Sequence, residues 1–174
     1  MSCPMKFTRH LVPNVFKCLE EENYVMKGEN VVQRAKLLFN QQYFGVLVTH
    51  HGNYPYPSLV AFSSADDASR IMFATSCNTT KYKNMENDPH VCFFVNNKEN
   101  VPSDVTTTTT VAAYGKAHLD GNGSNYKIMQ RALMERVRTL DEFFRKDTTK
   151  FITISVERLQ VINNFSNVME EYFQ

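Results

Sequence analysis

The hydrophobic period of the chain changes at Phe44, and this change constrains the fold more than any other feature of the sequence. Before it, apolar residues recur at helical spacing and predict an amphipathic helix over Glu29–Gln42. After it, β-prone apolar runs alternate with polar turns, which is typical of strands. Six strands are predicted, over Phe44–Thr49, Pro57–Ser63, Arg70–Thr75, Val91–Val95, Thr106–Ala117 and Phe151–Ile162. The first three are close enough in sequence to form an antiparallel meander.

Helices interrupt these strands. A short helix is predicted over Thr79–Asn87, with Thr79 or Asn78 as its cap and Pro89 just beyond its end. A longer one is predicted over Asn125–Leu140 from its apolar face. Long β-stretches with helical insertions indicate an α+β barrel rather than alternating βαβ units.

The domain organisation is simple. Residues 29–174 are assigned to one barrel domain, and residues 1–28 to an N-terminal extension with one short helix. The threonine run Thr106–Thr110 is assigned to a strand because threonine favours strands. The tail after Asn163 is expected to pack on the core or on a partner.

Charge and length disfavour several classes of protein. A net charge of +1 gives no attraction to nucleic acid or to an acidic membrane. No apolar run approaches the roughly 18–20 residues that span a bilayer, and the first residues lack the apolar stretch of a signal peptide. We therefore expect a cytoplasmic protein whose four cysteines are reduced thiols. No metal site is expected, since His50 and His51 are neighbours on a strand and point to opposite faces.

One segment combines hydroxyl groups with a cation. Between Phe73 and Lys81 the chain passes from a strand end into a helix start and carries four hydroxyl side chains. Free backbone N–H groups and the helix dipole favour an anion there. Thr79, Thr80 and Lys81 could thus bind a phosphate, although a capped surface helix with a solvated lysine would show the same residues.

A longer stretch around this segment resembles the pyridoxamine 5′-phosphate oxidase-like superfamily, the FMN-binding split barrels. The family pattern is a strand, an acidic turn, a strand ending in Phe-x-Thr, a Ser/Thr-x-Lys helix start and an Asn-x-Pro-x-Val sequence. Its counterparts here are Pro57–Phe62, Asp66–Asp67, Met72–Thr75, Thr79–Lys81 and Asn87–Val91. The resemblance implies a six-stranded antiparallel split β-barrel for residues 29–174.

The resemblance also implies a cofactor and a partner. The family binds FMN at a homodimer interface. Backbone groups of the second strand would line the flavin ring, Thr75 would face the ring or the ribityl chain, and the partner subunit would add Asn97. The implied cofactor-binding residues are Ser58, Leu59, Val60, Ala61, Phe62, Thr75, Thr79, Thr80, Lys81 and Asn97.

Departures from the family pattern bear on the substrate. Ser58 and Ser63 stand where the oxidase itself has an arginine and a lysine, Thr80 replaces an arginine, and the chain has no tryptophan for the oxidase's C-terminal motif. The resemblance therefore indicates an FMN-dependent oxidoreductase with an unknown small substrate or electron donor and no assigned catalytic residue. The alternatives are a non-catalytic flavin or electron carrier, and a member of the same fold that binds the deazaflavin F420 or haem.

Overall fold

A computed structural model describes residues 31–99, 101–119, 126–164 and 167–174. The predicted N-terminal extension with its short helix lies outside these residues. Among the described residues, no helix combines the length and the apolar character that crossing a membrane requires.

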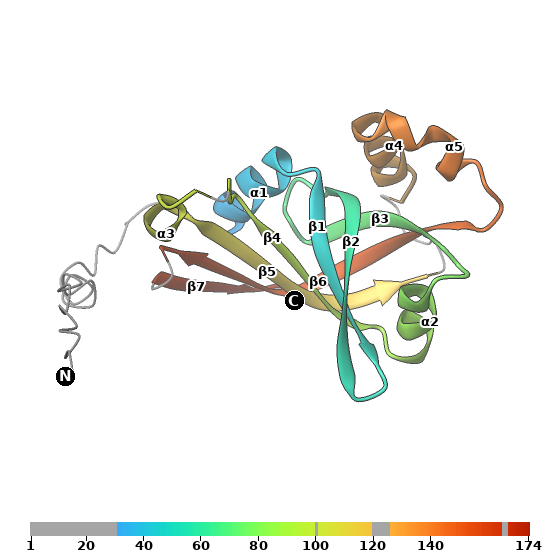
Figure 1. The fold of residues 1–174 in the computed structure, drawn as a ribbon, viewed down its shortest axis with the longest axis horizontal. Helices are drawn as coiled ribbons and strands as arrows, with labels where there is room; N and C mark the ends of the chain where they lie inside the picture. The colour runs from blue at the N-terminus through green and yellow to red at the C-terminus, as the bar shows by residue number, and fades with distance from the viewer. Residues whose placement is uncertain (1–30, 100, 120–125, 165–166) are drawn as a thin grey trace, which may run out of the picture.

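Six antiparallel strands close into a barrel, which confirms the predicted fold class (Figure 1). They pair in the order β3-β2-β1-β4-β5-β6, and β6 pairs back onto β3. Their bounds are β1 Phe44–His51, β2 Tyr54–Ser64, β3 Arg70–Ser76, β4 His90–Asn96, β5 Thr109–His118 and β6 Thr149–Asn163. Because β6 is 15 residues long, its first half pairs with β3 and its second half pairs with β7, Asn167–Tyr172.

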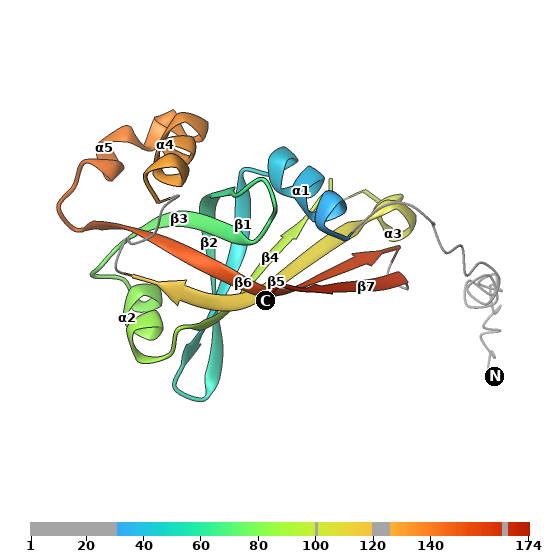
Figure 2. The same cartoon turned by 180° about the vertical axis from the view of Figure 1, so that it is seen from behind.

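The helices occupy the ends and one side of the barrel (Figures 1 and 2). α1 packs on the core through Ala35, Leu38 and Phe39, and α4 packs against β2 and β3. The helical elements are α1 Val31–Gln41, α2 Thr80–Asn87, α3 Asp104–Thr107, α4 Tyr126–Arg136, the 3-10 helix Arg138–Leu140 and α5 Asp141–Phe144. The long predicted helix over 125–140 is therefore α4 followed by one 3-10 turn.

Alternate residues of the strands fill the barrel interior. Phe62 and Phe93 are fully buried, and their rings meet edge to face with centroids 4.9 Å apart. Phe39 of α1 contacts Phe62 in the same way at 5.8 Å, so the helix is joined to the barrel core. A second apolar cluster lies between Met72 of β3 and Leu133 of α4.

Two strand predictions need correction. Thr106 and Thr107 belong to α3, and β5 begins only at Thr109. The hydroxyls of Thr106 and Thr107 donate to the Ser103 carbonyl at 3.1 and 3.0 Å, and that of Thr108 donates to the Asp104 carbonyl. These local bonds stabilise a helical turn and outweigh the strand preference of threonine. In the tail, residues 167–172 form the unpredicted strand β7.

A single arginine joins α4 to the end of α1. Arg136 Nη2 donates to the carbonyls of Phe39, Asn40 and Gln42 at 2.7–2.9 Å. The last carbonyls of a helix have no partner inside the helix, so the guanidinium supplies the missing donors.

Replacing Arg136 with methionine should lower the free energy of unfolding by about 2 kcal/mol, the scale for losing hydrogen bonds from a charged group. Urea denaturation measures the loss. Arg131→Met on the same helix is the control, because Arg131 is exposed and forms no hydrogen bond or ion pair with a described residue. Equal stabilities of the two variants would contradict the capping role.

Candidate functional site

Strand β2 has an edge that the barrel leaves unpaired. β2 pairs with β1 from Tyr54 to Ala61, but with β3 only from Phe62 to Ser64. Beyond Phe73, β3 pairs with β6 alone. The β1–β2 hairpin therefore separates from β3, as Figure 1 shows.

One hydrogen bond at the end of β2 shows which main-chain groups of the strand point toward β1 and which point away. The Phe62 N–H donates to the Tyr43 carbonyl at 3.2 Å, on the β1 side. Main-chain groups alternate between the two edges of a strand, so those of Leu59 and Ala61 point away from β1. Pro55 and Pro57, which have no N–H, fall in the same phase. Main-chain donors and acceptors of β2 are thus presented at its unpaired edge.

The predicted flavin strand contributes mainly its backbone. Val60 and Phe62 point into the barrel and are buried, and the side chain of Leu59 is 69% exposed. Ser58 and Ala61 are half-buried. None of these five side chains carries a charge, so any ligand beside β2 would meet peptide groups, apolar carbons and at most the Ser58 hydroxyl.

Thr75 and Thr79 are brought together at the start of α2. The Thr79 hydroxyl donates to the Ser76 carbonyl at 2.8 Å, and the Oγ1 atoms of the two threonines are 3.1 Å apart. Because the Thr79 proton is used at Ser76, Thr75 is the donor of this second bond. Thr79 caps α2 by position, yet its side chain makes no capping bond. The first N–H groups of the helix therefore remain without a side-chain acceptor.

Lys81 lies in the first turn of the same helix. It is half-buried, and desolvation by burial lowers the pKa of its ammonium group. No described carboxylate forms an ion pair with it. A partly desolvated cation next to free helix N–H groups is an arrangement that an anion would stabilise.

A series of side-chain hydrogen bonds joins the other side of α2 to β1. No sequence pattern predicted these bonds. Buried Asn84 donates from Nδ2 to Thr49 Oγ1 at 2.9 Å, and its Oδ1 lies 2.9 Å from His51 Nδ1. Thr80 lies on this side too. It lines a cavity of about 630 Å³ between the end of β1 and α2.

Asn97 lies away from the other predicted residues of its own chain. It follows β4, whereas α2 precedes this seven-residue strand, so the two ends are separated by about 23 Å at ~3.3 Å per residue. Its Oδ1 accepts the Thr109 N–H at 2.8 Å. Asn97 and Lys81 of the same chain therefore do not lie in one site.

The outer side of the barrel next to β2 carries an apolar surface. Register places Leu59, Val46 and Phe94 in one row across three strands, and Val48, Cys92 and Tyr114 in the next. All six point away from the interior and are half-buried or exposed. We call these six residues the outer sheet patch.

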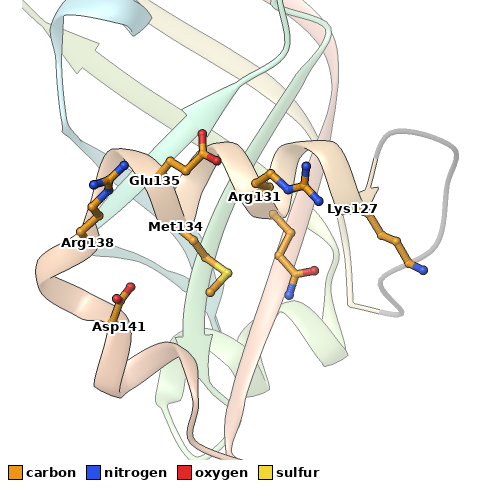
Figure 3. Close-up of a pocket in the computed structure, with 7 residues that line it drawn as sticks. Lys127, Arg131, Met134, Glu135, Arg138 and Asp141 are labelled. Atoms are coloured by element: carbon orange, nitrogen blue, oxygen red, sulfur yellow. The ribbon is translucent and has the colours of Figure 1, made fainter.

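A cavity of about 680 Å³ lies on the opposite side of α4 from the core (Figure 3). Lys127, Arg131, Glu135, Arg138 and Asp141 line it together with Met134 and Gln130. It contains none of the predicted cofactor-binding residues. Its mixture of opposite charges is what a solvated helix surface shows. Across the residues that the structure covers, no three His, Cys, Asp or Glu side chains gather as metal ligands.

Comparison with known families identifies the family of this chain. A family model described as pyridoxamine 5′-phosphate oxidase matches residues 31–163. A search of curated proteins gives no significant match.

Solved structures share the fold at low sequence identity. A haem-binding protein from Mycobacterium smegmatis has a TM-score of 0.74 at 13% identity; the match covers 83% of this chain, which spans 59% of that protein. A FAD-binding protein from Mesorhizobium loti has a TM-score of 0.60 at 13% identity and coverages of 74% and 89%. A NimC/NimA family protein from Clostridium acetobutylicum has a TM-score of 0.61 at 12% identity and coverages of 82% and 92%. At these identities the likeness establishes the fold alone.

Proposed function

Because the chain belongs to the pyridoxamine 5′-phosphate oxidase family, we propose that it binds FMN beside β2 as a homodimer and acts as an FMN-dependent oxidoreductase on a small substrate. The single observation that carries this proposal is the unpaired edge of β2 in a barrel whose α2 begins with hydroxyls and a lysine that pairs with no described carboxylate. A flavin has a polar ring edge and an anionic phosphate, and these two features of the fold are complementary to them.

The residues at α2 fit a phosphate monoester. Lys81 supplies a full positive charge that no described carboxylate neutralises, and charged hydrogen bonds to phosphate are the strong ones. Thr75 and Thr79 lie together at the start of α2, and each would turn its hydroxyl from its present acceptor to donate to the phosphate. The first turn adds N–H donors that no side chain caps. Thr80 fits less well, because it lines the cavity toward His51. We assign the phosphate to Thr75, Thr79 and Lys81 first.

The backbone of β2 would hold the ring. Peptide N–H groups of Leu59 and Ala61 can donate to ring acceptors without bringing a charge into the site, and uncharged donors tune a flavin's potential. Val60 and Phe62 anchor the strand through the core. Bound FMN would supply the hydride or electron transfer, and the described side chains offer no acid or base that we assign to catalysis.

The homodimer is supported by the outer sheet patch. Leu59 belongs both to this patch and to the unpaired strand, so a second copy covering the patch would also reach the edge of β2. Burying apolar area contributes roughly 25 cal/mol per Å². A partner on this face would also bring its own Asn97, three residues after Phe94 of the patch, toward the cofactor.

Absorbance spectroscopy of the purified protein tests the cofactor. Flavin bands, with FMN released into the supernatant after heating and identified by mass, are expected. Release of FAD, a Soret band, or a deazaflavin spectrum would replace FMN by another ligand; the haem-binding and FAD-binding proteins of the same fold make these the relevant alternatives. If no small donor reduces the bound flavin and no small acceptor reoxidises it, the protein is a non-catalytic flavin or electron carrier rather than an enzyme.

Substituting Phe94 with glutamate should convert the dimer to a monomer and release the flavin, because it places a charge within the outer sheet patch. Light scattering coupled to gel filtration measures the mass, and absorbance measures the bound flavin. Ile128→Glu is the matched control on the outside of α4, where Ile128 is 68% exposed. A Phe94→Glu protein that stays dimeric would show that this face is not the interface.

A further inference from the structure

The cavity between the end of β1 and α2 is a separate site from the unpaired edge of β2. It has a volume of about 630 Å³. The β1–β2 hairpin and α2 lie side by side in both views of the fold (Figures 1 and 2). Its walls are polar and consist of His50, His51, Gly52, Thr80, Lys83, Asn84, Asn87 and Asp88.

His51 is held in one orientation by buried groups. Thr49 and His51 are two residues apart on β1, so their side chains share a face, and Asn84 of α2 bridges them. The Thr49 hydroxyl donates to the Tyr56 carbonyl at 3.4 Å and therefore accepts from the Asn84 amide.

This series of hydrogen bonds determines which ring nitrogen of His51 carries the proton. With its amide nitrogen turned to Thr49, Asn84 presents Oδ1 to His51 Nδ1, and an amide oxygen can only accept. Nδ1 is thus the protonated nitrogen of the neutral ring, and Nε2 is left for a ligand. The anchor itself is solvent-free, since Asn84 is only 3% exposed and Thr49 is fully buried.

Two formal charges line the cavity, those of Lys83 and Asp88. Lys83 forms no ion pair with a described residue. The one carboxylate, Asp88, already accepts the N–H and the Nδ1 of His90 at 3.0 and 2.7 Å, and these bonds lower the pKa of Asp88. The Asp88 carboxylate is therefore already hydrogen-bonded by a residue outside the cavity lining.

We propose that this cavity binds a small oxyanion, a phosphate or carboxylate group, between Lys83, Thr80 and the Nε2 of His51. The lysine supplies charge, and the threonine hydroxyl supplies a neutral donor. Because Nε2 of the neutral ring has no proton, the anion would be taken up together with one proton; Nδ1–H then donates to Asn84 and Nε2–H donates to the anion. The site does not depend on flavin binding, because Lys83 and His51 are outside the group of residues assigned to FMN.

Titration of the full chain with inorganic phosphate and, separately, with acetate tests this site. The readouts are the NMR signals of the histidine rings, with the His51 signal assigned from His51→Gln, and calorimetry. At least one of the two anions should shift the His51 signal at saturation. The anion that binds more tightly identifies the chemistry. Lys83→Gln should weaken that binding about tenfold, the scale for one charged hydrogen bond.

Lys81→Gln serves as the matched variant on the same helix. The His51 response should persist in Lys81→Gln and be restored in Lys83→Arg. Loss of the response in Lys81→Gln but not in Lys83→Gln would place the anion at the flavin phosphate residues and overturn the proposal. So would the absence of any response to both anions. The FMN absorbance of the same samples reports on the flavin proposal independently.

Discussion

Replacing Lys81 with alanine is expected to weaken FMN binding by roughly 5- to 150-fold, equivalent to about 1–3 kcal/mol for a lost charged hydrogen bond. The reason is geometric and electrostatic. Lys81 is the cation in the first turn of α2, half-buried and without an ion pair to any described carboxylate. Fluorescence titration of the apoprotein with FMN measures the change. Lys127→Ala, which removes an exposed lysine of α4, should leave the dissociation constant unchanged.

The pH dependence of FMN affinity gives a second test of the same residue. Burial lowers the pKa of Lys81 below its ordinary value, and a bound phosphate would stabilise the protonated form. Affinity should therefore fall as pH rises through the lowered pKa of Lys81, at a pH below that of a solvated lysine. The Lys81→Ala protein should lose this alkaline decline. An unchanged affinity or an unchanged pH profile in the variant would remove Lys81 from the flavin site.

Replacing Gly115 with alanine is expected to destabilise the barrel by about 3 kcal/mol or more, at the upper end of the costs of overpacking. Gly115 lies at the irregularity in the β5–β6 ladder, where the register shifts between Tyr114 and Gly115. A Cβ there would overlap the Ser155 carbonyl oxygen and come within 3.0 Å of Val156 Cα. Both are backbone atoms, so no side-chain rotation relieves the overlap and the strands must separate.

Thermal and urea denaturation measure this loss. Gly52→Asn is the control, because Gly52 has a φ of +61° in the β1–β2 turn and open space around its Cα, and asparagine tolerates that conformation. The control should differ from the parent by about 1 kcal/mol or less. A Gly115→Ala protein of parental stability would mean that β5 and β6 can move apart at no cost.

Most of the fold could be predicted from local patterns. β-prone apolar runs bounded by polar turns, such as Phe44–Thr49 and Phe151–Ile162, predict strands because their side chains must be buried in the core. α2 was predicted from its cap position and Pro89. α3 and β7 could not be predicted in this way. α3 is determined by local hydrogen bonds of threonine hydroxyls, and β7 is determined by its pairing with the second half of β6.

Some residues of the candidate site could also be predicted from sequence, and others could not. Thr75, Thr79 and Lys81 are neighbours in sequence, so a strand end followed by a helix start was enough to group them. Asn84 carried no such signal, since its partners Thr49 and His51 are 35 and 33 residues away. Arg136 likewise caps a helix that ends nearly a hundred residues earlier in the chain.

The sequence by itself determined the six barrel strands, the amphipathic helices and the hydroxyl-lysine turn before α2, because each depends on the order of nearby residues. Only the tertiary structure decided which edge of β2 stays unpaired, that Thr80 lines the cavity toward His51 while Thr79 contacts Thr75, and that His51 Nε2 is left for a ligand. Those features depend on where distant strands stop pairing and on which buried donors meet. The hydrophobic period of the sequence predicts neither where strands stop pairing nor which buried groups form hydrogen bonds.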